Sequence, residues 1–258
     1  DTLTTAHTSQ VTIRSSYEKA QLTREAWMLP GGMALLRDDV CSSNPRSFTH
    51  QIHGNGNASS GTFSFAEENG QAVWRSGRAS LHAVVQNTET GGRTETALRT
   101  HSPRYRVIAQ HNVLLNTVNC DTACFLTALI PSTQAQPDPR LFASSAMGTA
   151  KVRIVTHDRT LSATARKTRG ELALPIASSM YGATGKTLAV AQSFSETIMV
   201  FEACTRIEED GRTVFIADSP ASGVLRLIGD TIELTADAAL GSGCRIGLGR
   251  VPSRVGGS

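Results

Sequence analysis

The sequence has few charged and few aromatic residues for its length. Charged residues make up 18% of the 258 positions, below the usual quarter, and 40% are hydrophobic, which is typical of a globular chain rather than a disordered one. The 25 basic and 22 acidic residues nearly balance, and the basic ones are scattered, so no nucleic acid partner is expected. Three tyrosines and two tryptophans are few for an autonomous carbohydrate-binding platform.

The chain also lacks long apolar runs, a leader segment and a cysteine framework. No apolar stretch reaches the roughly 20 residues that a membrane-spanning helix needs, so no membrane association is expected. The sequence begins at Asp1 without a charged and apolar leader, and we expect a processed or excised product with a further part upstream. Five cysteines, an odd number, argue against an all-disulfide scaffold and leave their oxidation state open.

Helical periodicity is nearly absent, and strand-type patterns take its place. Short runs of β-branched and aromatic residues recur between clusters of Gly, Asn, Asp, Ser and Pro. Asp210-Gly211 marks a tight turn between two such runs. The repeated strands predict an all-β protein with little helix, built as a large antiparallel β-sandwich.

A proline-rich stretch divides the strands into two groups. Residues 131–150 contain three of the nine prolines and show weak periodicity. We therefore predict a connector there, between a central β-sandwich domain over 1–130 and a C-terminal β-sandwich domain over 151–258. The pattern leaves open whether the two groups form one extended sandwich or two packed units.

Familiar nucleotide and hydrolase motifs are incomplete or missing. Gly185-Lys186-Thr187 ends like a phosphate-binding loop, but Met180 stands where that motif needs glycine, and a strand pattern follows instead of a helix. Neither G-x-S-x-G nor H-E-x-x-H occurs. These classes of enzyme are therefore not favoured.

The densest group of ligand-type residues lies in the segment 35–57, with two aspartates, a cysteine and two histidines. Residues 44–46 are predicted to form a turn between two strands. In the second strand His50 and His53 face opposite sides, so only one of them could share a metal with Asp38 or its neighbour. A simple hydrogen bond between carboxylate and imidazole accounts for the same residues.

The order of features from Arg24 to His53 resembles a segment of the heparinase II/III-like polysaccharide lyases. That segment has a strand beginning with Arg, a turn with a small residue, an apolar strand ending in Asp, and a strand ending in His. The positions that fall on this pattern are Arg24, Trp27, Gly31 or Gly32, Leu35, Leu36, Asp38, Pro45, Phe48, Ile52 and His53. Over the remainder the likeness is looser, strand after strand.

The resemblance implies a two-part enzyme in which a helical toroid precedes a large β-sandwich and a polyanionic polysaccharide binds between them. The implied reaction is β-elimination: a uronate carboxylate is neutralised, a base removes the C5 proton, and an acid protonates the leaving oxygen. This chain is then expected to be the β-sandwich part, secreted or periplasmic, working with a toroid of the same gene product. The alternative is a non-catalytic carbohydrate-binding or structural β-sandwich.

The resemblance also implies roles for individual histidines and one aspartate. The family's β domain lends a catalytic histidine from a His-Asn-Thr strand, and the nearest positions here are His7, which lacks the following Asn, and His111, which has it. Some members hold zinc through His and Asp, which points to Asp38 and His53 as metal ligands. Otherwise these are ordinary strand residues.

A uronate polymer also needs cationic and aromatic contacts. The arginine guanidinium binds carboxylate or sulfate with two parallel hydrogen bonds, and arginines are dense over residues 74–106. The candidate substrate-binding residues are Trp74, Arg78, Arg104 and Tyr105. Strand ends with solvated arginines explain the same cluster without a ligand.

Overall fold

The structure, a computed structural model, describes residues 2–4, 9–17, 19–54, 61–89, 92–101, 108–146, 148–177, 179–229, 231–236, 244–246 and 254–257. Nearly all of these residues form strands, and the only helix among them is the three-residue 3₁₀ turn η1 (Pro30–Gly32). The prediction of an all-β chain with little helix is confirmed. All five cysteines are unpaired.

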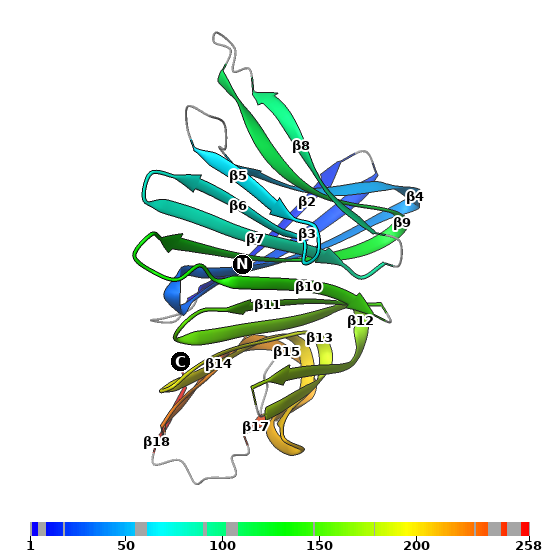
Figure 1. The fold of residues 1–258 in the computed structure, drawn as a ribbon. Helices are drawn as coiled ribbons and strands as arrows, with labels where there is room; N and C mark the ends of the chain where they lie inside the picture. The colour runs from blue at the N-terminus through cyan, green and yellow to red at the C-terminus, as the bar shows by residue number, and fades with distance from the viewer. Residues whose placement is uncertain are drawn as a thin grey trace.

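The first sheet contains the first nine strands and is antiparallel throughout. These strands are β1 (Thr2–Thr4), β2 (Ser9–Tyr17), β3 (Ala20–Leu29), β4 (Met33–Gly54), β5 (Thr62–Ala66), β6 (Gln71–Ser76), β7 (Ala79–Asn87), β8 (Arg93–His101) and β9 (Ile108–Thr133). Their order is β1-β2-β3-β4-β9-β7-β6-β5, and β8 pairs with β9 beside this path (Figure 1). The centre of the sheet therefore joins β4 to a strand far along the chain.

The second sheet contains the remaining strands and is mostly a meander, in which each strand pairs with the next. These strands are β10 (Arg140–Ala146), β11 (Thr149–Val155), β12 (Arg159–Ile176), β13 (Ser179–Ser193), β14 (Glu196–Glu209), β15 (Arg212–Ile228), β16 (Thr231–Ala236), β17 (Cys244–Ile246) and β18 (Arg254–Gly257). Only β16 and β18 pair in parallel among the strands described. The predicted turn at Asp210-Gly211 joins β14 to β15, and both residues have positive φ, as a type I′ hairpin turn requires.

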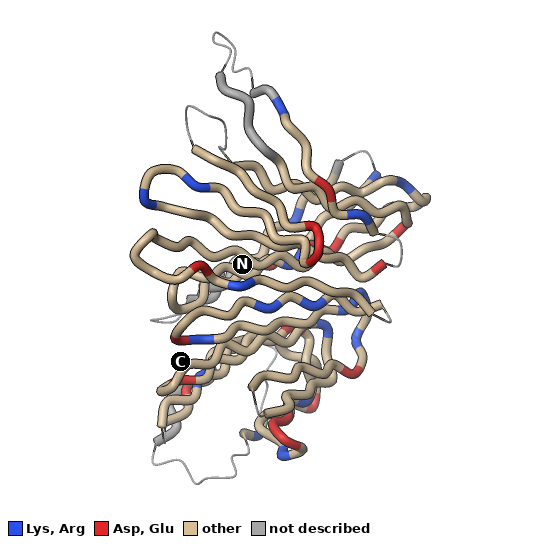
Figure 2. Tube along the Cα trace, in the orientation of Figure 1, with Lys and Arg blue, Asp and Glu red and all other residues tan. Residues whose placement is uncertain are grey.

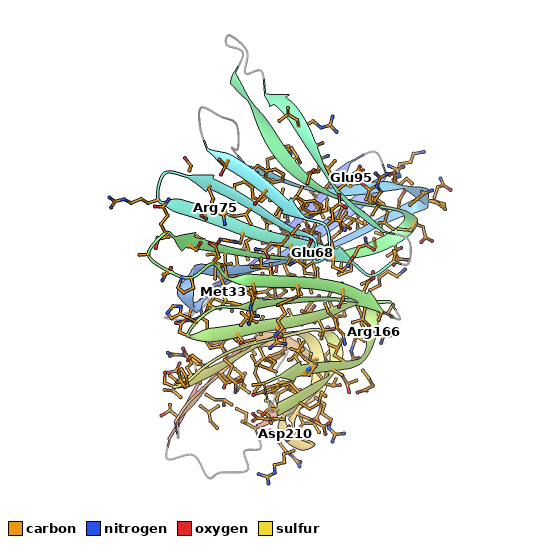
Figure 3. All side chains as sticks on the ribbon, in the orientation of Figure 1. Met33, Glu68, Arg75, Glu95, Arg166 and Asp210 are labelled. Atoms are coloured by element: carbon orange, nitrogen blue, oxygen red, sulfur yellow. The ribbon has the colours of Figure 1, made fainter. Side chains whose placement is uncertain are left out.

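The two sheets pack face to face, and we call the boundary between them the seam. In Figure 1, β7 and β9 of the first sheet lie next to β10 and β11 of the second. Side chains fill the space between the ribbons, with the fully buried Met33 at the boundary (Figure 3). The hydrophobic core of the seam draws on both sheets and includes Trp27, Met33, Leu126, Ile154, Leu161 and Val200. The protein is thus a large antiparallel β-sandwich.

Each sheet also bends over itself and encloses a second core on its outer side. In the first sheet the pairing of β4 with β9 shifts register between Cys41 and Arg46. His50, which follows the shift, lies 2.9 Å from Asp38, which precedes it, so the two halves of β4 face one another. The core enclosed by this bend includes Trp74, Val85, Leu114 and Phe125, and the second sheet encloses an equivalent core with Tyr181, Leu188, Phe201 and Phe215.

The turn predicted at residues 44–46 is wrong, because β4 continues through it as one strand of 22 residues. The chain does not reverse there; it bends, and residues between Cys41 and Arg46 fall out of the regular pairing with β9. Pro45 lacks a backbone N–H and is tolerated at such an irregularity. Proline and asparagine are favoured both in a turn that reverses the chain and in a bend within one strand. The sequence therefore suggested a turn where the structure has a bend.

Most of the stretch 131–150 is strand. β9 ends at Thr133 and β10 begins at Arg140, so among the described residues of this stretch only 134–139 and Gly148 lie outside strands. The weak periodicity of β10 reflects its place at the edge of the second sheet, where most of its side chains are exposed. The division into a central and a C-terminal domain stays a prediction.

Candidate functional site

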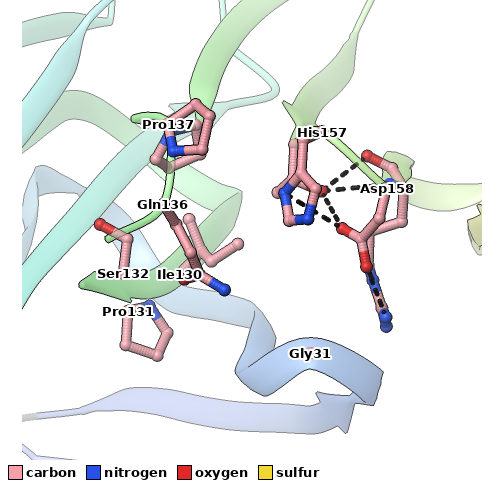
Figure 4. Close-up of a pocket in the computed structure, with 11 residues that line it drawn as sticks. Gly31, Ile130, Pro131, Ser132, Gln136, Pro137, His157 and Asp158 are labelled. Atoms are coloured by element: carbon pink, nitrogen blue, oxygen red, sulfur yellow. Dashed lines mark hydrogen bonds and ion pairs between the residues drawn. The ribbon is translucent and has the colours of Figure 1, made fainter. Parts of the chain in front are cut away.

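A cavity on the seam has a volume of about 180 Å³, and we call it the seam pocket. Its three walls come from η1, from the end of β9 with the segment that follows it, and from the turn between β11 and β12. Figure 4 shows His157 and Asp158 facing Gln136 and Pro137 across the opening, with Gly31 beneath them. The lining residues are Gly31, Ile130, Pro131, Ser132, Gln136, Pro137, Pro139, Thr156, His157, Asp158 and Arg159.

The turn at 156–159 is held rigidly by its own hydrogen bonds. The backbone N–H of Thr156 donates to the carbonyl of Arg159 at 2.9 Å, and the hydroxyl of Thr156 donates to Asp158 Oδ1 at 2.7 Å. Arg159 donates from Nε and Nη2 to Asp158 Oδ2 at 3.2 and 3.0 Å. The hydrogen bonds from Arg159 and Thr156 lower the pKa of Asp158 to about 2. Asp158 therefore presents an oriented acceptor, ionised at neutral pH, at the pocket wall.

Gly31 forms the floor because two constraints exclude a side chain there. Its φ of +80° lies in the left-handed region that glycine adopts without strain. A Cβ at this position would also come within 3.0 Å of Arg159 Nη1. The guanidinium of Arg159 thus rests on the glycine backbone and is engaged by Asp158 at its other edge, which leaves little of it open to a ligand.

Beside the pocket, His82 is fully buried and lies within reach of Ser132 and Asp138. His82 Nε2 is 2.9 Å from Ser132 Oγ and 3.5 Å from Asp138 Oδ1, so serine and aspartate approach the same ring nitrogen. A Ser-His-Asp triad needs them on opposite nitrogens. The backbone N–H of Leu141 donates to Gln71 Oε1 at 3.4 Å, which turns the Gln71 amide so that its N–H donates to His82 Nδ1 at 3.2 Å.

This arrangement fixes the histidine as a donor and not as a base. Nδ1 accepts from Gln71, so Nε2 carries the proton and donates it to Ser132. Burial lowers the pKa of His82, the nearby Arg75 lowers it further, and Asp138 only partly opposes them. His82 is therefore neutral, Ser132 is not activated as a nucleophile, and the cluster ties β6, β7 and β9 to β10.

Asp38 and His53, the implied metal pair, are not brought together. Asp38 is buried and accepts two hydrogen bonds from Arg24, at 2.6 and 2.8 Å, while His50 Nδ1 lies 2.9 Å away. His53 is exposed on the opposite face of the strand, 3.2 Å from Gln51 Oε1. Within the described residues no three His, Cys, Asp or Glu side chains converge so as to hold a metal ion.

The environment of Asp38 keeps it ionised in the interior. Burial raises its pKa, but the hydrogen bonds from Arg24 and His50 outweigh burial, and the net pKa is lowered. His50 is also stacked on Phe125, with ring centroids 5.7 Å apart, and its Nε2 is 3.1 Å from the hydroxyl of Thr127. Asp38 thus forms an ion pair with Arg24 of β3 and contacts His50 across the two halves of β4.

The implied substrate-binding residues are placed apart from one another or are not described. Trp74 is 4% exposed and packs against Phe63 at a centroid distance of 5.2 Å, so its ring face is part of the core. Arg78 is exposed in the turn between β6 and β7. The other implied residues lie outside the described part of the chain: His7, Arg104, Tyr105 and the side chain of His111.

Sequence reasoning missed Arg37, which is fully buried and is the least exposed charged side chain in the part of the chain that the structure describes. Its side chain has no exposure and donates to Asp39, at 2.8 to 3.1 Å, to Thr187 at 2.5 Å, to the carbonyl of Arg166 at 3.0 Å and to Glu202. Thr187 in turn donates to Glu202 at 2.9 Å. Arg37 follows the buried Leu35 by two positions, and strand alternation was the signal that could have pointed it into the seam.

No protein-family model matches the chain, and no curated protein matches it either. Figure 2 shows basic and acidic residues intermixed along the strands of both sheets. Among the described residues no helix is long and apolar enough to cross a bilayer.

Proposed function

We propose that this chain is the β-sandwich part of a lyase that cleaves an acidic polysaccharide by β-elimination, and that it contributes contacts to the sugar rather than the groups that move protons. The observation that carries the proposal is the seam pocket, a preformed cavity with an aliphatic side and a polar side. Ligand sites of this kind are concave, lie between packed units, and place a few polar groups precisely.

The lining of the seam pocket suits one sugar ring. Ile130, Pro131 and Pro137 offer rigid aliphatic surface to the C–H face of a pyranose, while Asp158 and Gln136 offer acceptors and donors to its hydroxyl groups. Asp158 is already oriented by Arg159 and Thr156, so binding costs little reordering. Because Arg159 balances the charge of Asp158, the pocket favours a hydroxylated ring over an isolated ion.

The choice of reaction comes from the resemblance, and the position of the matching segment supports it. That segment forms β3, η1 and most of β4, which are central to the first sheet, and its Gly31 is the pocket floor. No tyrosine lines the seam pocket, and the one histidine there, His157, is exposed beside Asp158. Proton transfer is therefore assigned to the toroid that the resemblance implies.

The proposal is tested by following the ultraviolet absorbance of unsaturated uronides while the complete gene product acts on heparin, alginate and chondroitin sulfate. We expect absorbance to rise with at least one polymer. Asp158→Asn should raise KM about tenfold and leave kcat nearly unchanged, since it removes uniform binding. Asp218→Asn, at an exposed position on β15, is the matched control. Absence of absorbance with all three polymers rejects the lyase.

A second candidate is a non-catalytic carbohydrate-binding module. The observation that favours it is the same pocket considered alone, since a sugar ring could be held there without any proton transfer by the lining residues. Tight binding of this chain to glycans on an array, without eliminative cleavage by the complete product, would support the module over the lyase.

A further inference from the structure

A second cavity lies at the other end of the same stretch of β4, and we call it the lysine pocket. Its volume is about 170 Å³, and its lining includes Asp39, Thr122, Lys167 and Lys186. β4 starts at Met33 beside the seam pocket and reaches this cavity at Asp39, six residues later, which corresponds to about 20 Å of extended strand. The two pockets are therefore separate sites on one boundary.

Irregular strand pairing builds the lysine pocket from both sheets. Register shifts fall between Ala165 and Gly170 on β12, between Thr184 and Thr187 on β13, and between Cys41 and Arg46 on β4. Lys167 and Lys186 lie within the first two of these shifts. Bulges re-aim side chains that regular alternation would place elsewhere, and they recur beside functional sites. Here they bring two ammonium groups to a single cavity.

The ammonium group of Lys186 makes only a long ion pair within the described part of the protein. It lies 3.9 Å from Asp39 Oδ2, beyond hydrogen-bond length, and that oxygen already accepts from Arg37 at 2.8 Å. Lys167 donates to Glu89 at 2.9 Å and to the carbonyl of Thr122 at 3.3 Å, which leaves its third N–H. Both lysine side chains are one third exposed, so their donors can reach a ligand.

The charges around the cavity cancel, which restricts what it can bind. Three cations, Arg37, Lys167 and Lys186, stand with three anions, Asp39, Glu89 and Glu202. These six residues together carry no net charge, so they would not attract an anion by a general positive potential. A ligand must instead be recognised by directed hydrogen bonds. Two lysine N–H groups aimed into one small cavity suit a compact oxyanion with several acceptor atoms.

We propose that the lysine pocket binds the carboxylate or sulfate group of an acidic saccharide unit, with Lys186 as the principal donor and Lys167 as the second. The choice of an oxyanion as the ligand follows from the hydrogen-bond donors in the cavity. The choice of a saccharide as its carrier rests on the proposed function. The lysine pocket then binds the acidic group of the polymer, while the seam pocket binds a sugar ring at another point of the seam.

The test is calorimetric titration of this chain, which needs no catalysis. The probes are size-defined heparin and alginate oligosaccharides, their desulfated or carboxyl-reduced counterparts, and sodium sulfate at matched ionic strength. Lys186→Met should weaken binding of the acidic oligosaccharides about tenfold, and Lys186→Arg should retain most of it. Lys151→Met on β11 removes the same charge outside the pocket and should change the affinity less than about twofold.

Three results would overturn the proposal. The first is equal weakening by Lys186→Met and Lys151→Met, which would mean non-specific attraction. The second is equal affinity for the acidic probes and their neutral counterparts, or no binding of the acidic probes at all. The third is sulfate alone binding as tightly as the oligosaccharides, which would make the cavity a simple anion site. The lyase is judged separately by uronide absorbance, so either can fail without the other.

Discussion

The two faces of β4 bury charge in opposite ways. On the face toward the seam, a cation stands at the centre: Arg37 has no exposure and is surrounded by Asp39, Glu202 and Thr187. On the other face, one residue along, an anion stands at the centre: Asp38 is held by Arg24, whose side chain is 36% exposed, and by His50. The adjacent residues Arg37 and Asp38 thus point into two different parts of the interior, Arg37 into the seam and Asp38 into the space between the two halves of β4.

The two clusters differ in whether water can hydrate the remaining charged group when its partner is removed. Glu202, whose side chain is 14% exposed, is largely enclosed beside Arg37, and burial raises its pKa, so removing the cation would leave a carboxylate with little access to water. In the other cluster Arg24 reaches solvent and can be hydrated without Asp38. An enclosed pair therefore depends on both of its partners, while a half-open pair depends mainly on its buried member.

The largest effect should come from Arg37→Met, which we expect to lower the free energy of unfolding by about 3–5 kcal/mol, because Glu202 is left buried without its partner. Urea denaturation measures this loss. Arg75→Met, which breaks the exposed pair with Asp138, is the control and should cost less than about 1 kcal/mol. The double variant Arg37→Met/Glu202→Met should recover much of the loss, and a double variant as unstable as the single one would contradict this account.

A smaller effect is expected for Asp38→Asn, which should lower the free energy of unfolding by about 2 kcal/mol. Arg24 stays partly hydrated in this variant, whereas His50 loses its carboxylate partner and the new Asn amide is buried without a charge to pair with Arg24. The pKa of Asp38 is lowered in the fold, so its contribution is complete above the ordinary value of 3.8 and is lost as the pH falls through the folded pKa. Acid unfolding followed by circular dichroism should show a shallower stability loss in Asp38→Asn than in the parent. Parallel acid profiles would argue against the ion pair.

The smallest effect should come from the neutral His82, which is hydrogen-bonded to Gln71 and Ser132. Burial lowers its pKa, so the neutral form is favoured; its contribution is complete above the ordinary value of 6.5 and is lost as the pH falls below that value. We expect the parent to lose stability more steeply than His82→Gln between pH 6.5 and 5, as measured by thermal unfolding. A variant with an unchanged slope would show that another group titrates there.

Local patterns predicted strands and facing directions well but not the contacts between distant segments. Alternation placed His50 and His53 on opposite faces, and the structure buries the first and exposes the second. It could not tell which histidine meets Asp38, because that contact depends on the bend after Cys41, and a bend and a turn have the same composition. The resemblance indicated His53, and the fold pairs Asp38 with His50.

The pockets lay beyond sequence reasoning for a related reason. The seam pocket combines residues near 31, 131 and 157, and the lysine pocket combines residues near 39, 122, 167 and 186. Each set comes together only when the two sheets pack, and Lys167 and Lys186 point into their cavity because of register shifts that leave no clear mark in composition. A single sequence carries no measure of such long-range register.

The order of strands has a consequence for how the chain folds. In the second sheet most strands pair with their immediate neighbours in sequence, so its ladders can form as a succession of hairpins. In the first sheet Ala34 pairs with Leu129, and the centre cannot close until nearly all of that half has been synthesised. Non-local pairing of this kind slows folding by the entropy of closing a long loop. The half of the chain that leaves the ribosome first is therefore expected to be the slower to acquire its structure.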